Sequence, residues 1–207
     1  MRAGSARGAP CRLAGWVLGL VIATAAGCGG SRPPSVSPAT RSAVAHADDA
    51  ERARRHDQAR ALYQAALREA ADPLSRAYAA RAYADVLLLW GEAVAAAEAL
   101  QAVVEAAPED PAGWHDLGIV RHSLGDLVGA QTALQRAVAL APADPRPHIA
   151  LAALYWKTGQ RAEAVAEYRV LLTLELPARV RAKVEWAVEQ LTRPAEPGSL
   201  TKTAKPS

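Results

Sequence analysis

The chain has 207 residues, 51% of them hydrophobic and only 5% aromatic, and a formal net charge of +3. Three of its 24 Lys and Arg residues lie in residues 1–27, which contain no Asp or Glu, so the rest of the chain is neutral. Nucleic-acid binding needs clustered Lys and Arg to neutralise phosphates, and this balance excludes it as an expected function.

Residues 1–27 have the pattern of an export signal. A basic leader precedes an uncharged run at 13–27, which is shorter than the roughly 20 residues of a membrane-spanning helix. The run ends in the residues Thr-Ala-Ala-Gly before Cys28, and small residues before a cysteine resemble a bacterial lipobox. We therefore expect residues 1–27 to be a lipoprotein signal and Cys28 to be lipidated. The alternative is ordinary cleavage near 23–25, which would give a freely secreted protein.

Cysteine content favours lipidation. Cys11 leaves with the signal, so Cys28 would be the only thiol of the mature chain, and a lone exported thiol needs an explanation. Several acyl chains would hold the protein firmly, since each buried methylene contributes about 0.8 kcal/mol. Residues 28–41 are rich in Gly, Ser and Pro, which predicts a flexible tether. In such lipoproteins a residue other than Asp after the cysteine implies outer-membrane sorting, so Gly29 predicts a protein on the outer membrane facing the periplasm.

The segment at about 40–73 has the composition of two helices. Its second half contains Ala59, Tyr63 and Ala66 at helical spacing and ends in Asp72-Pro73. Its first half lacks the glycine and the large residue that later segments have, which leaves its boundaries open.

Residues 111–144 show the local chemistry of a helix pair most clearly. Asp110 can accept hydrogen bonds from the first amides of a helix, and Pro111 fits the first helical position. Gly125 can adopt the positive φ that ends a helix, and Pro142 stops the second helix. Each helix would have about 13–15 residues, a marginal length in isolation, so packing must stabilise the pair.

The same pattern recurs every 34 residues. Turn glycines, small residues, large residues and prolines repeat at this step, namely Gly91, Gly125 and Gly159; Ala96, Ala130 and Ala164; Leu100, Leu134 and Tyr168; and Pro108 and Pro142. Helix pairs of this period resemble the tetratricopeptide repeat. The resemblance implies an all-α, right-handed α-solenoid of stacked helix pairs.

The solenoid is expected to cover residues 42–191. It would contain a degenerate repeat at about 40–73, three clear repeats at 77–110, 111–144 and 145–178, and a capping helix at 177–191 that covers the last apolar face. Residues 192–207, with three prolines and two lysines, are expected to form a disordered tail.

The resemblance also implies a concave binding face formed by the first helix of each pair. The expected lining is Tyr78, Arg81, Asp85 and Leu88; His115, Asp116, Ile119 and His122; and Arg146, Ile149, Trp156 and Lys157. Trp156, Tyr78 and Ile119 are the expected anchors for a protein or peptide partner, because large rings dominate interface energies. The alternative is that Trp156 and Tyr78 pack between repeats, a role also expected for Trp90 and Trp186.

A chaperone-type carboxylate clamp is not expected. Family members with that clamp use Lys and Asn on the first helices, whereas this chain has no Asn, and the matching positions hold Arg81, Asp85, His115, Ile119, Ile149 and Ala153.

No catalytic motif, metal site or cofactor is predicted. His115 and His122 are seven residues apart, roughly 10 Å along a helix, which is too far to share one metal ion. The leading hypothesis is a membrane-anchored envelope adaptor, with assembly of an envelope complex as one role it could serve. The alternative is an enzyme or the noncatalytic subunit of one, whose only plausible catalytic groups in 40–76 are His46, Asp48, Asp49 and His56.

Overall fold

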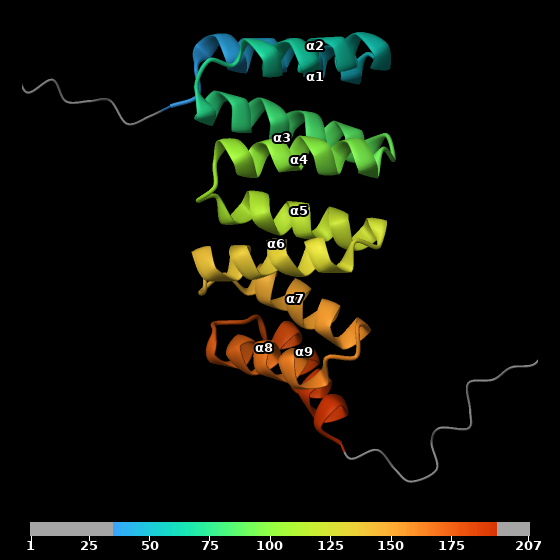
Figure 1. Cartoon of the computed structure of the whole chain (residues 1–207), viewed down its shortest axis with the longest axis vertical. Coiled ribbons are helices and arrows are strands. Elements are labelled where there is room, and N and C mark those ends of the chain that lie inside the picture. The colour runs from blue at the N-terminus through green and yellow to red at the C-terminus, as the bar shows by residue number, and fades with distance from the viewer. Residues whose placement is uncertain (1–34, 194–207) are drawn as a thin grey trace, which may run out of the picture. The chain divides into compact units, whose positions relative to one another are not determined.

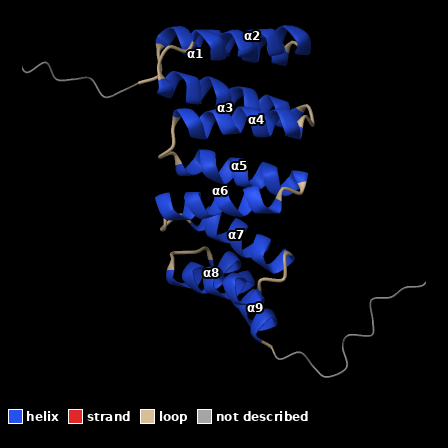
Figure 2. Cartoon of the chain, viewed as in Figure 1, coloured by secondary structure: helices blue, strands red, loops and turns tan. Residues whose placement is uncertain are grey.

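The computed structural model describes residues 35–193, and within them every regular element is an α-helix (Figures 1 and 2). The predicted signal, Cys28, half of the predicted tether and most of the predicted tail lie outside these residues. The helices are α1 (Pro38–Arg52), α2 (His56–Glu69), α3 (Pro73–Leu89), α4 (Ala93–Ala106), α5 (Pro111–Leu124), α6 (Leu127–Leu140), α7 (Pro145–Lys157), α8 (Arg161–Thr173) and α9 (Ala178–Thr192).

Aspartate caps set the start of four helices. Asp72, Asp110, Asp126 and Asp144 each accept a hydrogen bond from an amide in the first turn, at 2.8–3.0 Å. Three of them are followed by proline, whose missing N–H costs nothing at the first helical position. Helix starts are therefore encoded locally, as the sequence predicts at Asp110.

The turns inside the four pairs share one geometry. Gly91, Gly125 and Gly159 have φ of 78°, 82° and 79°, and Arg54 takes the same place in the first pair with φ 57°. In each turn the next amide donates to a carbonyl five residues back, at 2.8–3.0 Å. The left-handed conformation costs a non-glycine residue roughly 1–2 kcal/mol. The first pair therefore has the turn of the others without their glycine, which is why it looks degenerate in sequence.

Consecutive helices pack into four pairs, and α9 packs on α8 (Figure 1). The buried residues form three hydrophobic clusters along the stack, and each cluster is shared by neighbouring helices. A Cβ added at Gly118 would lie 2.7 Å from Leu134 Cγ, so α5 and α6 approach as closely as a glycine allows. The all-α stack of helix pairs predicted from the sequence is confirmed.

Two boundaries differ from the sequence expectations. α1 begins at Pro38, inside the predicted 28–41 tether, because Ser37 caps it by accepting from the Thr40 amide at 3.0 Å. The Ser37 amide also donates to Ser75 Oγ at 2.9 Å, which fixes this cap against α3. α3 begins at Pro73 rather than 77, because Asp72 caps it one turn before the repeat register does.

The first pair is a complete member of the stack. Tyr63 of α2 is fully buried, donates its hydroxyl to Asp48 of α1, and stacks on Tyr83 of α3 with ring centroids 5.5 Å apart. His56 contacts Glu51 at 3.0 Å. Asp48 and His56, which the sequence left open for chemistry, thus make structural contacts.

Candidate functional site

First helices of neighbouring pairs approach one another closely at two of the three steps along the stack. Among the helices of residues 35–193, α1 contacts α3 and α5 contacts α7, whereas α3 and α5 are less close and no two second helices make a comparable contact. Helices on the inner side of a curved stack lie closer together than those on the outer side. We call the exposed side of α3, α5 and α7 the first-helix face.

Arg81 joins α3 to α5 at the centre of this face. Its guanidinium donates to Asp110 at 2.6 Å and to Asp116 at 2.5 Å, and His115 contacts Asp116 at 3.1 Å. Asp110 also caps α5, so the same carboxylate positions a helix and holds the arginine. Arg81 therefore ties the register of one repeat to the next.

The carboxylates of this cluster have shifted pKa values. Burial opposes ionisation of Asp116, but the hydrogen bond with His115 and the charge of Arg81 outweigh it and hold its pKa below the usual range. Partial desolvation raises the pKa of Asp85, with Arg81 opposing and Asp116 adding to the shift. Asp85 faces the cluster without forming an ion pair within the described residues, which leaves it available to a cationic ligand group.

A second polar link connects α5 with α7. Lys157 donates to His122 Nε2 at 3.1 Å. Arg146 donates hydrogen bonds from two of its nitrogens to the Asp144 carboxylate at 2.7–3.1 Å, and this contact lowers the pKa of Asp144. His122 is thus paired with a lysine rather than with His115, and the two histidines belong to different clusters.

Large apolar side chains lie beside these charges. Tyr78, Leu88, Ile119, Ile149 and Trp156 are each 36–43% exposed. The chain's own packing leaves these side chains only partly covered, so the face offers apolar area as well as charge. All twelve residues expected for the lining lie on α3, α5 and α7.

The end of the face is a pocket between α7 and α9. It has a volume of about 400 Å³ and is lined mainly by Ile149, Trp156, Tyr168, Val180, Lys183 and Trp186. Trp156 lies 6.0 Å from Trp186 and 6.3 Å from Tyr168 between ring centroids.

Trp186 is the residue that sequence reasoning missed. It was expected to pack, but it is 57% exposed. The buried residues of α9 are Val184, Ala187 and Leu191, spaced three and four apart, and Trp186 lies off this stripe. The helical spacing of the sequence already places the Trp186 ring outside the buried stripe of the capping helix, and this position indicates that the ring is exposed.

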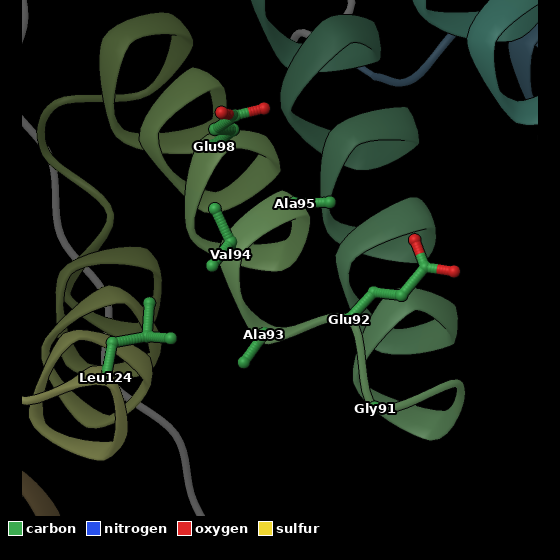
Figure 3. Close-up of a pocket in the computed structure, with 7 residues that line it drawn as sticks. All are labelled: Gly91, Glu92, Ala93, Val94, Ala95, Glu98 and Leu124. Carbon is green, nitrogen blue, oxygen red and sulfur yellow. The ribbon is translucent and has the colours of Figure 1, made fainter.

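A second depression lies away from the expected lining. Figure 3 shows it at the turn between α3 and α4, with Leu124 of α5 on its other side. It has a volume of about 550 Å³ and is lined by turn residues together with Val94 and Glu98. It contains none of the twelve predicted lining residues.

A family model described as Tetratricopeptide repeat matches residues 122–183, which run from the end of α5 into α9. This match covers less than a third of the chain, and it agrees with the 34-residue step and the four helix pairs. The chain contains tetratricopeptide repeats. No match was found among the curated proteins.

Solved structures share the fold of this tetratricopeptide-repeat protein. MamA matches at 19% identity with a TM-score of 0.62, covering 73% of this chain and 80% of that one. YrrB, described as a TPR protein with an unusual peptide-binding site, matches at 19% identity with a TM-score of 0.58, and the match covers 72% of this chain and 74% of YrrB. The Yersinia enterocolitica type III secretion chaperone SycD was solved with a peptide of the translocator YopD. It matches at 18% identity with a TM-score of 0.51, and the match covers 54% of this chain and 88% of SycD.

Two further findings concern chemistry and membranes. Within residues 35–193, no three His, Cys, Asp or Glu side chains come together in a way that would hold a metal ion. None of the helices in this part of the tetratricopeptide-repeat protein is long and apolar enough to cross a membrane.

Proposed function

We propose that this tetratricopeptide-repeat protein is a membrane-anchored adaptor of the cell envelope that binds a segment of a partner protein on its first-helix face. The observation that carries the binding proposal is the partial exposure of Tyr78, Ile119, Ile149 and Trp156 on a single face. Apolar side chains gathered on one surface are typical of interaction sites.

The charges of the face suit a peptide rather than a small molecule. The Arg81 cluster and the Lys157–His122 contact lie on successive pairs, so polar groups are spread along the stack. An extended peptide or a helix can meet such spaced groups in turn, and solenoids use their concave surfaces in this way. The peptide complex of SycD supports this mode of binding in a structurally similar protein.

The anchor is the part of the proposal that rests on sequence alone. Cys28 follows a signal-like run and a row of small residues, and it lies outside the described residues. Lipidation there would place the repeats at the outer membrane, facing the periplasm, where an adaptor could assist assembly of an envelope complex.

Binding is tested by crosslinking in intact cells followed by capture of the protein. Ile119→Glu places a charge on the first-helix face, and Val128→Glu makes the same change on α6, where Val128 is 79% exposed. We expect Ile119→Glu to reduce capture of the crosslinked partner about tenfold, as at an interface hot spot, and Val128→Glu to leave it unchanged. The reverse result would place the interface on the second helices and refute the proposal.

A further inference from the structure

The four tryptophans within residues 35–193 fall into two classes. Trp90 donates its indole N–H to Glu51 at 3.0 Å, and Trp114 donates to the Pro108 carbonyl at 2.8 Å. The indole N–H groups of Trp156 and Trp186 have no acceptor among the described residues, and the two side chains are 36% and 57% exposed. Neither N–H group is therefore engaged by another described residue.

Both free indoles belong to the pocket between α7 and α9. The planes of Trp156 and Trp186 are inclined by 33°, and Tyr168 meets Trp156 edge-on at 90°. Aliphatic side chains of Ile149 and Val180 complete the walls. A volume of about 400 Å³ lies near the lower end of the range for ligand sites, which suits one large side chain better than a folded partner element.

The surface of the pocket is almost entirely apolar, and one lysine brings a positive charge to it. Lys183 is the one charged residue in its lining, and no carboxylate in residues 35–193 lies within ion-pair distance of it. The ammonium group of Lys183 can only donate, whereas the Tyr168 hydroxyl of the same lining can also accept. A ligand that matches this pocket presents a large apolar group, and a carboxylate beside it would match the charge of Lys183.

We propose that this pocket binds the partner peptide through one large apolar side chain, with a neighbouring carboxylate held by Lys183. The carboxylate belongs either to an adjacent Asp or Glu or to the peptide's own C-terminus. The inference rests on the proposed function, since it names the anchor by which the first-helix face holds its partner.

The arrangement differs from a clamp built of Lys and Asn on the first helices. Here the cation comes from α9, the helix that ends the stack, and the apolar contact comes from aromatic rings on two helices. Rings dominate the energy and the carboxylate selects the ligand, because a charge–charge contact at a partly exposed site contributes little affinity by itself.

The probes are four short synthetic peptides of glycine and serine. The first, with blocked ends, carries one phenylalanine followed by one aspartate. The second replaces phenylalanine by alanine, and the third replaces aspartate by lysine. The fourth has phenylalanine at a free C-terminus and no aspartate, so it separates the two sources of the carboxylate.

Binding to the full-length protein is followed by the NMR signals of the indole N–H groups. The first peptide should shift the signals of Trp156 and Trp186 and leave those of Trp90 and Trp114 in place, because the latter two are already bonded internally. The alanine and lysine peptides should bind at least about tenfold more weakly. Equal binding of the alanine peptide, or shifts at Trp90 and Trp114 alone, would overturn the proposal.

Variants of α9 complete the test. Trp186→Ala should weaken the first peptide about tenfold, and since the ring is 57% exposed the fold should survive, which circular dichroism checks. Lys183→Glu should reverse the preference between the aspartate and lysine peptides. Arg179→Glu makes the same change on α9 outside the pocket and should keep the preference within about twofold, because exposed charges are screened. An unchanged preference in Lys183→Glu would refute the charged contact.

Partner capture separates this inference from the proposed function. If Ile119→Glu abolishes capture while Trp186→Ala and Lys183→Glu do not, the first-helix face binds the partner without the pocket, and the inference fails alone. If none of these variants affects capture, both fail. If Trp186→Ala abolishes self-association seen by sedimentation, a second copy of the chain occupies the pocket, and the inference is again refuted.

Discussion

At the scale of single residues, Arg81 has two roles that can be separated. It bridges α3 to the α5 cap through Asp110, and it lowers the pKa of Asp116 together with His115. The side chains of Asp110 and Asp116 are 32% and 40% exposed, so solvent screens part of their attraction to Arg81. The contribution to stability is therefore modest, while the effect on the charge pattern of the first-helix face is large.

Arg81→Gln should lower the free energy of unfolding by about 1 kcal/mol at pH 7. A carboxylate whose folded pKa is depressed stabilises the fold above its unfolded pKa, and this stabilisation is lost as the pH falls through the folded pKa. Since the pKa of Asp116 lies below its ordinary 3.8, the difference between wild type and variant should shrink below that pH. Urea titrations at several pH values measure it.

The control for this change is Arg169→Gln. Arg169 is exposed on α8 and makes no ion pair within residues 35–193, so its loss should leave stability unchanged at every pH. If the two variants behaved alike, or if the Arg81→Gln deficit grew in acid, the bridge would not stabilise the ionised form of Asp116.

At the scale of helices, α9 closes the stack by burying one narrow stripe. Val184, Ala187 and Leu191 pack into the cluster that α7 and α8 share, while Trp186 and Lys183 point elsewhere. One helix thus covers the last apolar surface and also supplies a wall of the pocket. Repeats contact mainly their neighbours, so stability in such an array is largely local.

Val184→Asp should therefore destabilise the C-terminal end selectively. Val184 is 4% exposed, and an unpaired carboxylate there costs about 3 kcal/mol. Hydrogen exchange should show lost protection in α7, α8 and α9 and retained protection in α1 to α4. Ala182→Asp, the same change at an exposed position of α9, should leave the pattern intact. Uniform loss of protection along the chain would contradict local stability.

At the scale of the whole molecule, the sequence predicted what local chemistry dictates. Asp110 caps the start of α5, and Gly125 ends it with a positive φ. Residues with the same roles recur every 34 residues, so the sequence alone reveals them. Arg54 shows the limit of that logic, since a turn without glycine adopts the same conformation through its surroundings. The all-α stack was predictable because most turns obey the local rule.

The pocket was not predictable for a physical reason. Trp156 and Trp186 lie on different helices, and the segment before the second of them departs from the repeat. Leu171 stands 34 residues after Ala137, where the repeat would place an alanine, and Pro177 comes one residue later than the 34-residue step from Pro142 predicts. Whether two rings meet depends on the rotation of α9, which its packing on α8 fixes. The predicted anchor Trp156 lies in the pocket, whereas Trp186 and Lys183 emerge only from the tertiary arrangement.

The proposed attachment of the protein to a membrane rests on Cys28. Cys28→Ala should release the protein from membranes and abolish incorporation of a labelled fatty acid, because removal of the acyl chains removes the apolar area that holds it. Cys11→Ala is the matched control, since that cysteine lies in the predicted signal and its loss should change neither result. Separation of the two membranes on a density gradient then tests the outer-membrane assignment.

The outcomes for Cys28 also decide between the two exported forms. A wild-type protein recovered from the periplasm without acyl label, with an N-terminus near Ala26, would show cleavage at 23–25 and a freely secreted adaptor. Retention of Cys28→Ala at the membrane with its label intact would refute lipidation at this residue.

A lipid anchor would confine the protein to a membrane surface. This would raise the effective concentration of the first-helix face for partners on the same membrane. A weak pocket anchored by one side chain can then suffice for binding, and release by Cys28→Ala should reduce partner capture even though the face is unchanged.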